Sequence, residues 1–238
     1  MILKGGFNIY GIPVGVISLE SFFPKPEGHI KNAPSFDFPV LYHTVKGATI
    51  DRLIGERDPE LLAPFIEAAQ ALEKEGVKAI TGSCGFLALH QQAIADAVKV
   101  PVFMSSLIQV PLVSRMMASD QKVAVVVANS DALTQDHLSG VGIADEPIVV
   151  AGMQAQPQFA EVILRGETND LDMDVFYAEL SGVVANTLAN NPDVGAIVLE
   201  CTDLSHFAPK LQEQFELPVF DLTSLTRMVA ATVVRTKA

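Results

Sequence analysis

Short apolar runs alternate along the chain with longer stretches that have helical periodicity. The runs at residues 14–19 and 123–128 are rich in valine and isoleucine, which is typical of parallel strands buried on both faces. Residues 59–74 place apolar side chains three and four positions apart, and residues 175–188 form a similar stretch, so both predict helices. Strands that alternate with helices predict βαβ units, and therefore parallel sheets with right-handed crossovers.

Part of this pattern occurs twice, at an offset of 117 residues. The offset places the strand that leads to Cys84 on the strand that leads to Cys201, and without a gap it places residues 101–103 on residues 218–220. These are the only two cysteines in the sequence. The repeat predicts an α/β fold of two pseudo-symmetric lobes, each a short parallel sheet flanked by helices, with the active site in the cleft between them.

The lobe boundaries follow from the repeat. We place the first lobe at residues 1–113 and the second at residues 114–222, and we expect residues 223–238 to form a helix that packs back on the first lobe. The longest irregular stretch, residues 22–42, follows the first strand and is rich in proline. It therefore leaves the carboxyl edge of the sheet, where ligands bind in open α/β sheets, and a loop of this length is usually functional or mobile.

Composition narrows the classes of function. Of the 238 residues 49% are hydrophobic and 18% are charged, which is enough for a packed core. The net charge of −12 argues against nucleic acid as a partner, and no apolar run approaches the length of a membrane span. The first residues show no signal-peptide pattern, and two cysteines do not make a disulfide scaffold, so we expect a cytoplasmic protein with free thiols. The five histidines have no zinc-site spacing, so no metal is predicted.

Each cysteine lies where a strand ends and a helix is about to begin. The backbone N–H groups of a helix start favour the thiolate, so we expect both pKa values to fall toward neutrality. A thiolate on one side of a cleft and a thiol on the other can remove and return a proton on opposite faces of one carbon. Free cysteine is also among the most buried residue types, so each thiol alone fits a purely structural role.

The motifs Thr81-Gly82-Ser83-Cys84-Gly85-Phe86 and Leu199-Glu200-Cys201-Thr202-Asp203 resemble those of the aspartate/glutamate racemase superfamily, which includes hydantoin racemases, maleate isomerases and arylmalonate decarboxylases. The resemblance covers nearly the whole chain. It implies catalysis without a cofactor, Cys84 and Cys201 as the two acid/base groups, a homodimer, and Ser83 and Thr202 as groups that help to hold a substrate carboxylate.

The chain departs from the amino-acid racemases of that superfamily at two places beside the thiols. Those enzymes usually have Cys-Asn-Thr where this chain has Cys84-Gly85-Phe86, and glutamate racemases usually have a histidine where this chain has Asp203. Phe86 makes the predicted pocket more apolar than one built for a small dianion.

Several other polar residues are predicted to lie near the cleft, and for each of them an ordinary structural role is an alternative to substrate binding. Ser106 and Asn129 equally fit turn or cap positions, and Glu20 fits an exposed acid of an acidic protein. Lys25 and Lys31 fit either a contact to a substrate carboxylate or solvated lysines, and His206 lies five residues after Cys201. The full set of predicted substrate-binding residues is Ser83, Gly85, Phe86, Thr202, Ser18, Glu20, Ser106 and Asn129.

The sequence thus predicts a cofactor-independent racemase or epimerase, an isomerase that uses two opposed cysteines on an amino acid, a hydantoin or a related carboxylate. Two alternatives stay open. One is a single-thiol isomerase or decarboxylase of a dicarboxylate, and the other is a small-molecule binding protein without turnover.

Overall fold

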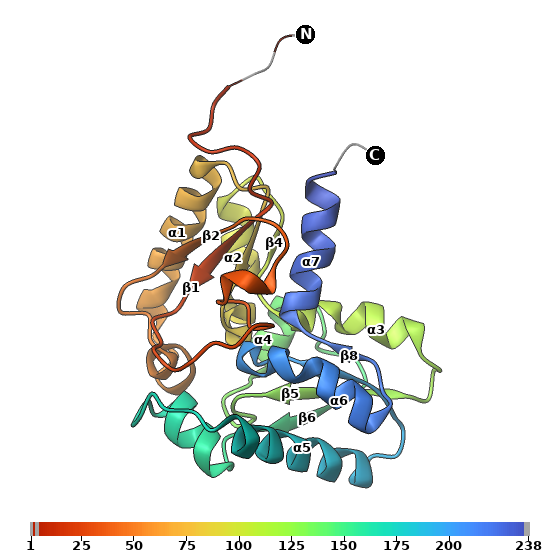
Figure 1. Ribbon diagram of the computed structural model, residues 1–238. Helices are drawn as coiled ribbons and strands as arrows, with labels where there is room; N and C mark the ends of the chain where they lie inside the picture. Colours follow the sequence, from red (N-terminus) through yellow and green to blue (C-terminus); the bar gives the residue numbers. More distant parts are fainter. Residues whose placement is uncertain (1, 3–4, 236–238) are drawn as a thin grey trace.

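The computed structural model of the protein describes residue 2 and residues 5–235. Within this part of the chain there are two four-stranded sheets, with strand orders β2-β1-β3-β4 and β6-β5-β7-β8, and every strand pair is parallel. Each sheet is flanked by helices (Figure 1). The predicted α/β architecture of two similar halves is therefore confirmed.

The strands follow the same order in each half. The strands are β1 (Val14–Ser18), β2 (Val40–Thr44), β3 (Ala79–Gly82), β4 (Val102–Phe103), β5 (Lys122–Val127), β6 (Ile148–Gly152), β7 (Val194–Leu199) and β8 (Val219–Phe220). The α-helices are α1 (Leu62–Glu75), α2 (Gln91–Ala97), α3 (Val110–Met116), α4 (Gln135–Gly140), α5 (Met173–Asn190), α6 (Ala208–Phe215) and α7 (Leu222–Val233). Five 3-10 turns, η1 (Ala33–Ser35), η3 (Pro59–Leu61), η4 (Gly85–His90), η5 (Ser106–Gln109) and η7 (Thr202–Phe207), and two π-helical turns, η2 (Asp51–Gly55) and η6 (Phe159–Leu164), complete the set.

The repeat seen in the sequence is also a repeat of hydrogen bonds. The amide of Ser83, just after β3, donates to the Ile17 carbonyl at 2.9 Å, and the amide of Glu200, just after β7, donates to the Val126 carbonyl at 2.9 Å. Ser83 and Glu200 therefore hold equivalent places at the carboxyl ends of the two central strands. Cys84 and Cys201 follow them directly, so both thiols lie at that edge of their sheets.

The largest apolar cluster contains residues of both halves. Alternate residues of the central strands, such as Ile17 and Ile197, belong to one buried cluster that also contains Phe65 of α1 and Phe176 of α5. The opposite face of the first sheet, through Val14, packs on α7. Helix α7 begins after β8 and returns across the first sheet (Figure 1). It ends at Val233, and residues 236–238 of the predicted helix lie outside the described residues.

Some local features differ from the prediction. The edge strands β2 and β6 were not predicted, and residues 40–42 of the predicted loop belong to β2. Each cysteine is followed by a 3-10 turn rather than directly by an α-helix. The lobe boundary between residues 113 and 114 stays a prediction. In the described residues no helix is both long and apolar enough to cross a bilayer; Met1, Leu3 and Lys4 of the predicted leaderless start lie outside them.

Candidate active site

The two cysteines line one small cavity between the two sheets. Its empty volume is about 390 Å³. Cys201 is buried, whereas Cys84 keeps part of its surface open to solvent. The cavity is lined by Leu19, Ser21, Lys31, Ile50, Ile54, Ser83, Cys84, Gly85, Phe86, Ala128, Ile163, Glu200, Cys201, Thr202 and Asp203. Four of the predicted substrate-binding residues, Ser83, Gly85, Phe86 and Thr202, are thus placed together with both thiols.

The hydroxyl groups beside the thiols connect the two halves. The Thr202 hydroxyl donates to the Ser83 carbonyl at 2.7 Å, and the Ser106 hydroxyl donates to the Leu199 carbonyl at 2.7 Å. The Ser83 hydroxyl accepts from the Leu19 amide at 2.9 Å, which leaves its own proton free for another partner. The thiols are therefore fixed relative to each other by hydrogen bonds between the ends of the strands.

The other predicted residues do not line this cavity. The Ser18 hydroxyl donates to the Leu19 carbonyl, and Ser106 is wholly buried in its contact to β7. Asn129 accepts from the Asp131 amide at 3.0 Å and so caps a turn, and Thr134, not Asn129, caps helix α4. The Glu20 carboxylate accepts from the Gly47 amide at 2.8 Å and lines a separate, more open pocket nearby.

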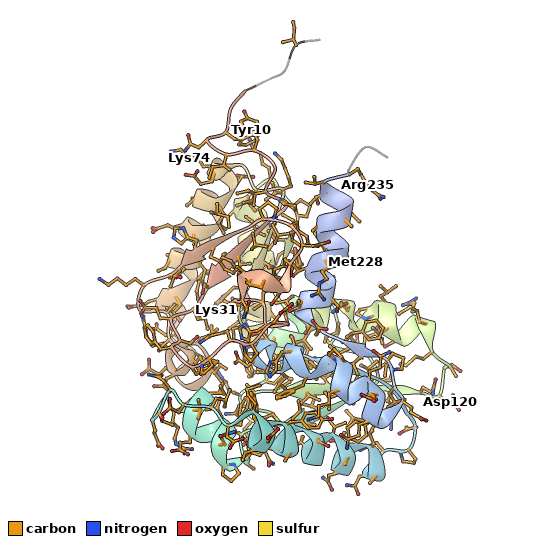
Figure 2. All side chains as sticks on the ribbon, viewed as in Figure 1. Tyr10, Lys31, Lys74, Asp120, Met228 and Arg235 are labelled. Carbon is orange, nitrogen blue, oxygen red and sulfur yellow. The ribbon has the colours of Figure 1, made fainter. Side chains whose placement is uncertain are left out.

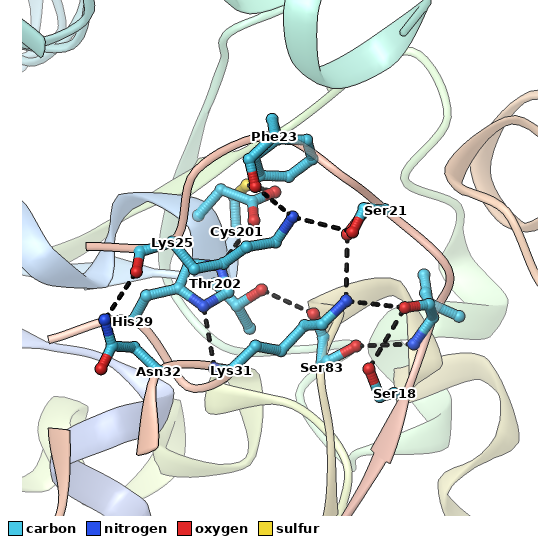
Figure 3. Close-up of polar contacts among 12 residues, drawn as sticks. Ser18, Ser21, Phe23, Lys25, His29, Lys31, Asn32, Ser83, Cys201 and Thr202 are labelled. Carbon is cyan, nitrogen blue, oxygen red and sulfur yellow. Dashed lines mark hydrogen bonds and ion pairs between the residues drawn. The ribbon is translucent and has the colours of Figure 1, made fainter. Parts of the chain in front are cut away.

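The long loop before β2 covers the cavity and brings a lysine into it. The Lys31 ammonium donates to the Leu19 carbonyl at 2.7 Å and to the Ser21 hydroxyl at 3.0 Å, and it points toward Ser83 (Figure 3). Helix α7 holds this loop, because the Thr223 hydroxyl donates to the Gly28 carbonyl at 2.9 Å. In Figure 2, Lys31 lies at the level where the two halves of the molecule meet. Burial lowers its pKa, and the nearby Asp203, Cys84 and Glu20 oppose that change.

An acid and a histidine stand beside Cys201. One carboxylate oxygen of Asp203 accepts from His29 Nε2 at 2.8 Å, and the other lies 3.7 Å from the Cys201 sulfur. His29 Nδ1 accepts from the Lys31 amide at 2.9 Å, which assigns the ring proton to Nε2. Burial raises the pKa of Asp203, but the hydrogen bond from His29 and nearby cations outweigh it, so the pKa lies below its usual value. His206 packs against Phe207 and Phe176 and does not line the cavity.

The pKa values of both thiols are raised, contrary to the expectation from their position before helices. Burial is the main cause for each, and the Glu200 and Asp203 carboxyl groups add to it. The backbone amides that were expected to lower the pKa, those of Phe86 and Asp203, act too weakly to compensate. The two thiols also differ, because the Lys31 ammonium lowers the pKa of Cys84 but is not among the groups that act on Cys201.

The sequence carried no motif that points to His29, which comes from the long loop. It left Lys31 open between a contact to a substrate carboxylate and a solvated lysine. Asp203 was noted only as a departure from the racemase pattern. No group of three or more His, Cys, Asp and Glu side chains in the described residues is arranged to hold a metal.

Solved structures of several enzymes share this architecture. Allantoin racemase from Klebsiella pneumoniae superposes with a TM-score of 0.64 and 17% identity, covering 93% of this chain and 87% of that one. Unliganded arylmalonate decarboxylase superposes with a TM-score of 0.58 and 15% identity over 95% and 94% of the two chains. The predicted resemblance to the aspartate/glutamate racemase superfamily is therefore confirmed at the level of the fold.

Proteins whose sequences are more similar to this chain than those of the solved structures are named as lyases. A dimethylsulfoniopropionate lyase from Durusdinium sp. clade D is 32% identical over 221 residues, which are 90% of this chain and 72% of that protein. Dimethylsulfoniopropionate lyase 3 of Emiliania huxleyi is 32% identical over 229 residues, and the matched region is 92% of this chain but only 59% of that longer protein. No family model matches the sequence. The chain belongs to the family of these dimethylsulfoniopropionate lyases.

The predicted function as a racemase or epimerase, and with it the isomerase class, is wrong. The relatives are named as dimethylsulfoniopropionate lyases, which are neither racemases nor other isomerases; the decarboxylase among the alternatives weighed above is also a lyase, but one that acts on a dicarboxylate. The two thiols have unlike surroundings, because a lysine acts on the pKa of Cys84 and a carboxylate lies against Cys201.

Proposed function

We propose that this chain is a lyase that releases dimethyl sulfide from dimethylsulfoniopropionate. The observation that carries the proposal is the similarity to lyases of that name over nine-tenths of the chain, together with both thiols and Lys31 in one cavity. The substrate is a zwitterion in which two methylene groups join a carboxylate to a dimethylsulfonium group.

The reaction is an elimination. A base removes a proton from the carbon beside the carboxylate, the electron pair of that C–H bond becomes the second bond between the two methylene carbons, and the C–S bond breaks with its electrons going to sulfur. The products are acrylate, dimethyl sulfide and a proton held by the base. Dimethyl sulfide leaves as a neutral molecule, so it needs no proton from an acid, and one base is sufficient.

Cys84 is the base that the charges favour. The Lys31 ammonium stabilises a thiolate at Cys84, whereas the Asp203 carboxylate at 3.7 Å from the Cys201 sulfur opposes a thiolate there. Lys31 donates two hydrogen bonds within the protein, so its third N–H is available for the substrate carboxylate. An ammonium at that position also stabilises the negative charge that builds up as the proton leaves.

The test is to incubate the reduced protein with dimethylsulfoniopropionate, measure dimethyl sulfide in the headspace by gas chromatography, and measure acrylate by proton NMR. The wild-type protein is expected to form both products in equal amounts. Cys84→Ala is expected to lose at least about a hundredfold in kcat, because it lacks the base. Lys31→Met is expected to lose about a hundredfold in kcat/KM, while Lys46→Met, which removes an exposed lysine, serves as the matched control.

Two results would overturn the proposal. The first is a reduced wild-type protein that forms no dimethyl sulfide. The second is a Cys84→Ala variant that retains wild-type turnover, which would assign the base to another group.

We also propose that the protein forms a homodimer. Leu112 and Met116 lie one turn apart on α3 and are 54% and 58% exposed, and such apolar side chains on one helix face favour self-association. Light scattering behind a sizing column is expected to give twice the chain mass of 25.5 kDa. A mass equal to one chain at micromolar concentration would refute it.

A further inference from the structure

Glu200 is a buried acid to which the reaction above assigns no role. Its side chain is completely buried, it lines the cavity between the two thiols, and neither carboxyl oxygen has a hydrogen-bond partner. Buried carboxyl groups are normally paired or hydrogen-bonded, because leaving them without partners costs several kcal/mol. A carboxyl group without a partner in a cavity therefore indicates a ligand that pairs with it.

The backbone is arranged to leave room for this carboxyl group. A Cβ atom at Gly85 would overlap both the backbone carbonyl of Glu200 and its Oε1 atom, so only glycine fits there. Amino-acid racemases of the superfamily usually have asparagine at the place of Gly85. At this departure from the racemase motif, the missing side chain leaves the space that Glu200 occupies.

The cavity that Glu200 lines has apolar walls as well as polar ones. Phe86, Ala128 and Ile163 are among its lining residues, and they offer no side-chain donor to a carboxylate. The Ala128 amide acts on the carboxyl group without completing a hydrogen bond. A sulfonium group is a cation without any N–H or O–H bond, so it needs a negative charge and apolar contact and no hydrogen bonds. Glu200 and its neighbours have that chemistry.

The two groups that would hold a short zwitterion line the same cavity as the proposed base. Lys31, Cys84 and Glu200 are all among its lining residues, and Lys31 and Glu200 act on the pKa of the Cys84 thiol in opposite directions. A substrate with its carboxylate at Lys31 and its cation at Glu200 therefore lies in the cavity that the Cys84 sulfur lines.

We propose that Glu200 is the residue that recognises the onium cation of the substrate, and that it ionises when that cation binds. This inference rests on the proposed function, because it takes the substrate to be a carboxylate with a cationic sulfonium end. Burial raises the pKa of Glu200 to about 8 in the empty site, so the group is mostly protonated at pH 7. Binding a cation beside it favours the carboxylate, and close to one proton is released for each ligand bound.

The experiment compares two ligands that have the same shape, and proton NMR of each mixture after the titration checks that the ligand has not been turned over. One is β-alanine betaine, which carries a trimethylammonium group, and the other is the carboxylate in which a tert-butyl group replaces it. Isothermal titration calorimetry at pH 7, in buffers with different ionisation enthalpies, gives both the affinity and the number of protons released. Because Lys31 contacts both carboxylates equally, the difference between the two ligands reports on the cation alone.

The wild-type protein is expected to bind the betaine at least about tenfold more tightly than its uncharged-end isostere, and to release a proton only with the betaine. Glu200→Gln, which keeps the shape and removes the charge, is expected to lose both the preference and the proton release. Glu27→Gln removes an exposed glutamate of the loop over the site and is expected to retain both. If Glu200→Gln does not fold, proton release by the wild-type protein with the two ligands decides the question.

A wild-type protein that shows no preference for the betaine, or that binds neither ligand, would overturn the inference. So would a folded Glu200→Gln variant that keeps the preference. The assay for dimethyl sulfide separates this failure from failure of the proposed reaction. If the protein forms dimethyl sulfide but its preference for the betaine does not depend on Glu200, only the inference is refuted. If the preference depends on Glu200 but no dimethyl sulfide forms, only the proposed reaction is refuted.

Discussion

Replacing Glu200 with glutamine should change how the stability of the empty protein depends on pH. In the unfolded chain this group ionises near its ordinary pKa of 4.5, and in the folded protein burial raises the pKa to about 8. Between these two values the folded state holds a proton that the unfolded state has lost, so unfolding releases a proton and the free energy of unfolding falls as pH rises. The contribution of the protonated group to the free energy of unfolding is thus fully present below pH 4.5 and is lost as pH rises through 8.

The magnitude follows from the size of the shift. Each pH unit within the interval costs about 1.36 kcal/mol, so the step from pH 5 to pH 8 removes about 4 kcal/mol. The group is fully buried, so solvent screening does not reduce this value much. A loss of this size is large compared with the total stability of about 5–15 kcal/mol that is typical of proteins.

The assay is urea denaturation of the wild-type protein and Glu200→Gln at pH 5, 6.5 and 8, followed by circular dichroism. Glutamine does not titrate, so the free energy of unfolding of the variant, relative to that of the wild type, is expected to rise by about 4 kcal/mol between pH 5 and pH 8. Other titrating groups contribute equally to both proteins and cancel in the difference. Glu27→Gln, at an exposed position, is the matched control and should follow the wild type. Parallel pH curves for wild type and Glu200→Gln would show that the buried carboxyl group is paired in solution and would refute the reasoning.

Two further predictions concern the same site. Gly85→Ala is expected to lower the free energy of unfolding by about 1–3 kcal/mol, because the added Cβ overlaps Glu200. Gly182→Ala in α5, where no atom lies within 4 Å of the added Cβ, should raise the free energy of unfolding by up to about 1 kcal/mol. Equal thermal melting temperatures for the two variants would contradict this prediction. Turnover of dimethylsulfoniopropionate should rise with pH above 7, because burial raises the pKa of the Cys84 thiol and the base must be ionised. In Lys31→Met this rise should move to higher pH, because the variant lacks the ammonium that lowers the pKa of Cys84. An identical pH profile in wild type and variant would show that Lys31 does not act on the thiol.

The sequence determined the fold and the position of the thiols because both depend on local patterns. Buried valine and isoleucine runs specify parallel strands, and the repeat that ends in Cys84 and Cys201 places both thiols at the carboxyl edges of their sheets. The residues that immediately flank them, Ser83 and Thr202, were found for the same reason, since neighbours in a short motif stay neighbours in space. The edge strand β2 escaped prediction because it follows a proline-rich segment.

The chemistry of the site depends on contacts between segments far apart in the sequence, so local sequence patterns do not reveal it. The long loop brings Lys31 to Cys84 and His29 to Asp203, a contact that spans 174 positions of the chain. Burial, which no local pattern reports, raised the pKa of both thiols where the helix-start argument predicted the reverse. Local patterns thus predict two equivalent thiols, while long-range folding places unlike charges beside them and makes their surroundings unequal. Their inequality follows from the electrostatics of desolvated groups, which depend on distance in space and not on distance along the chain.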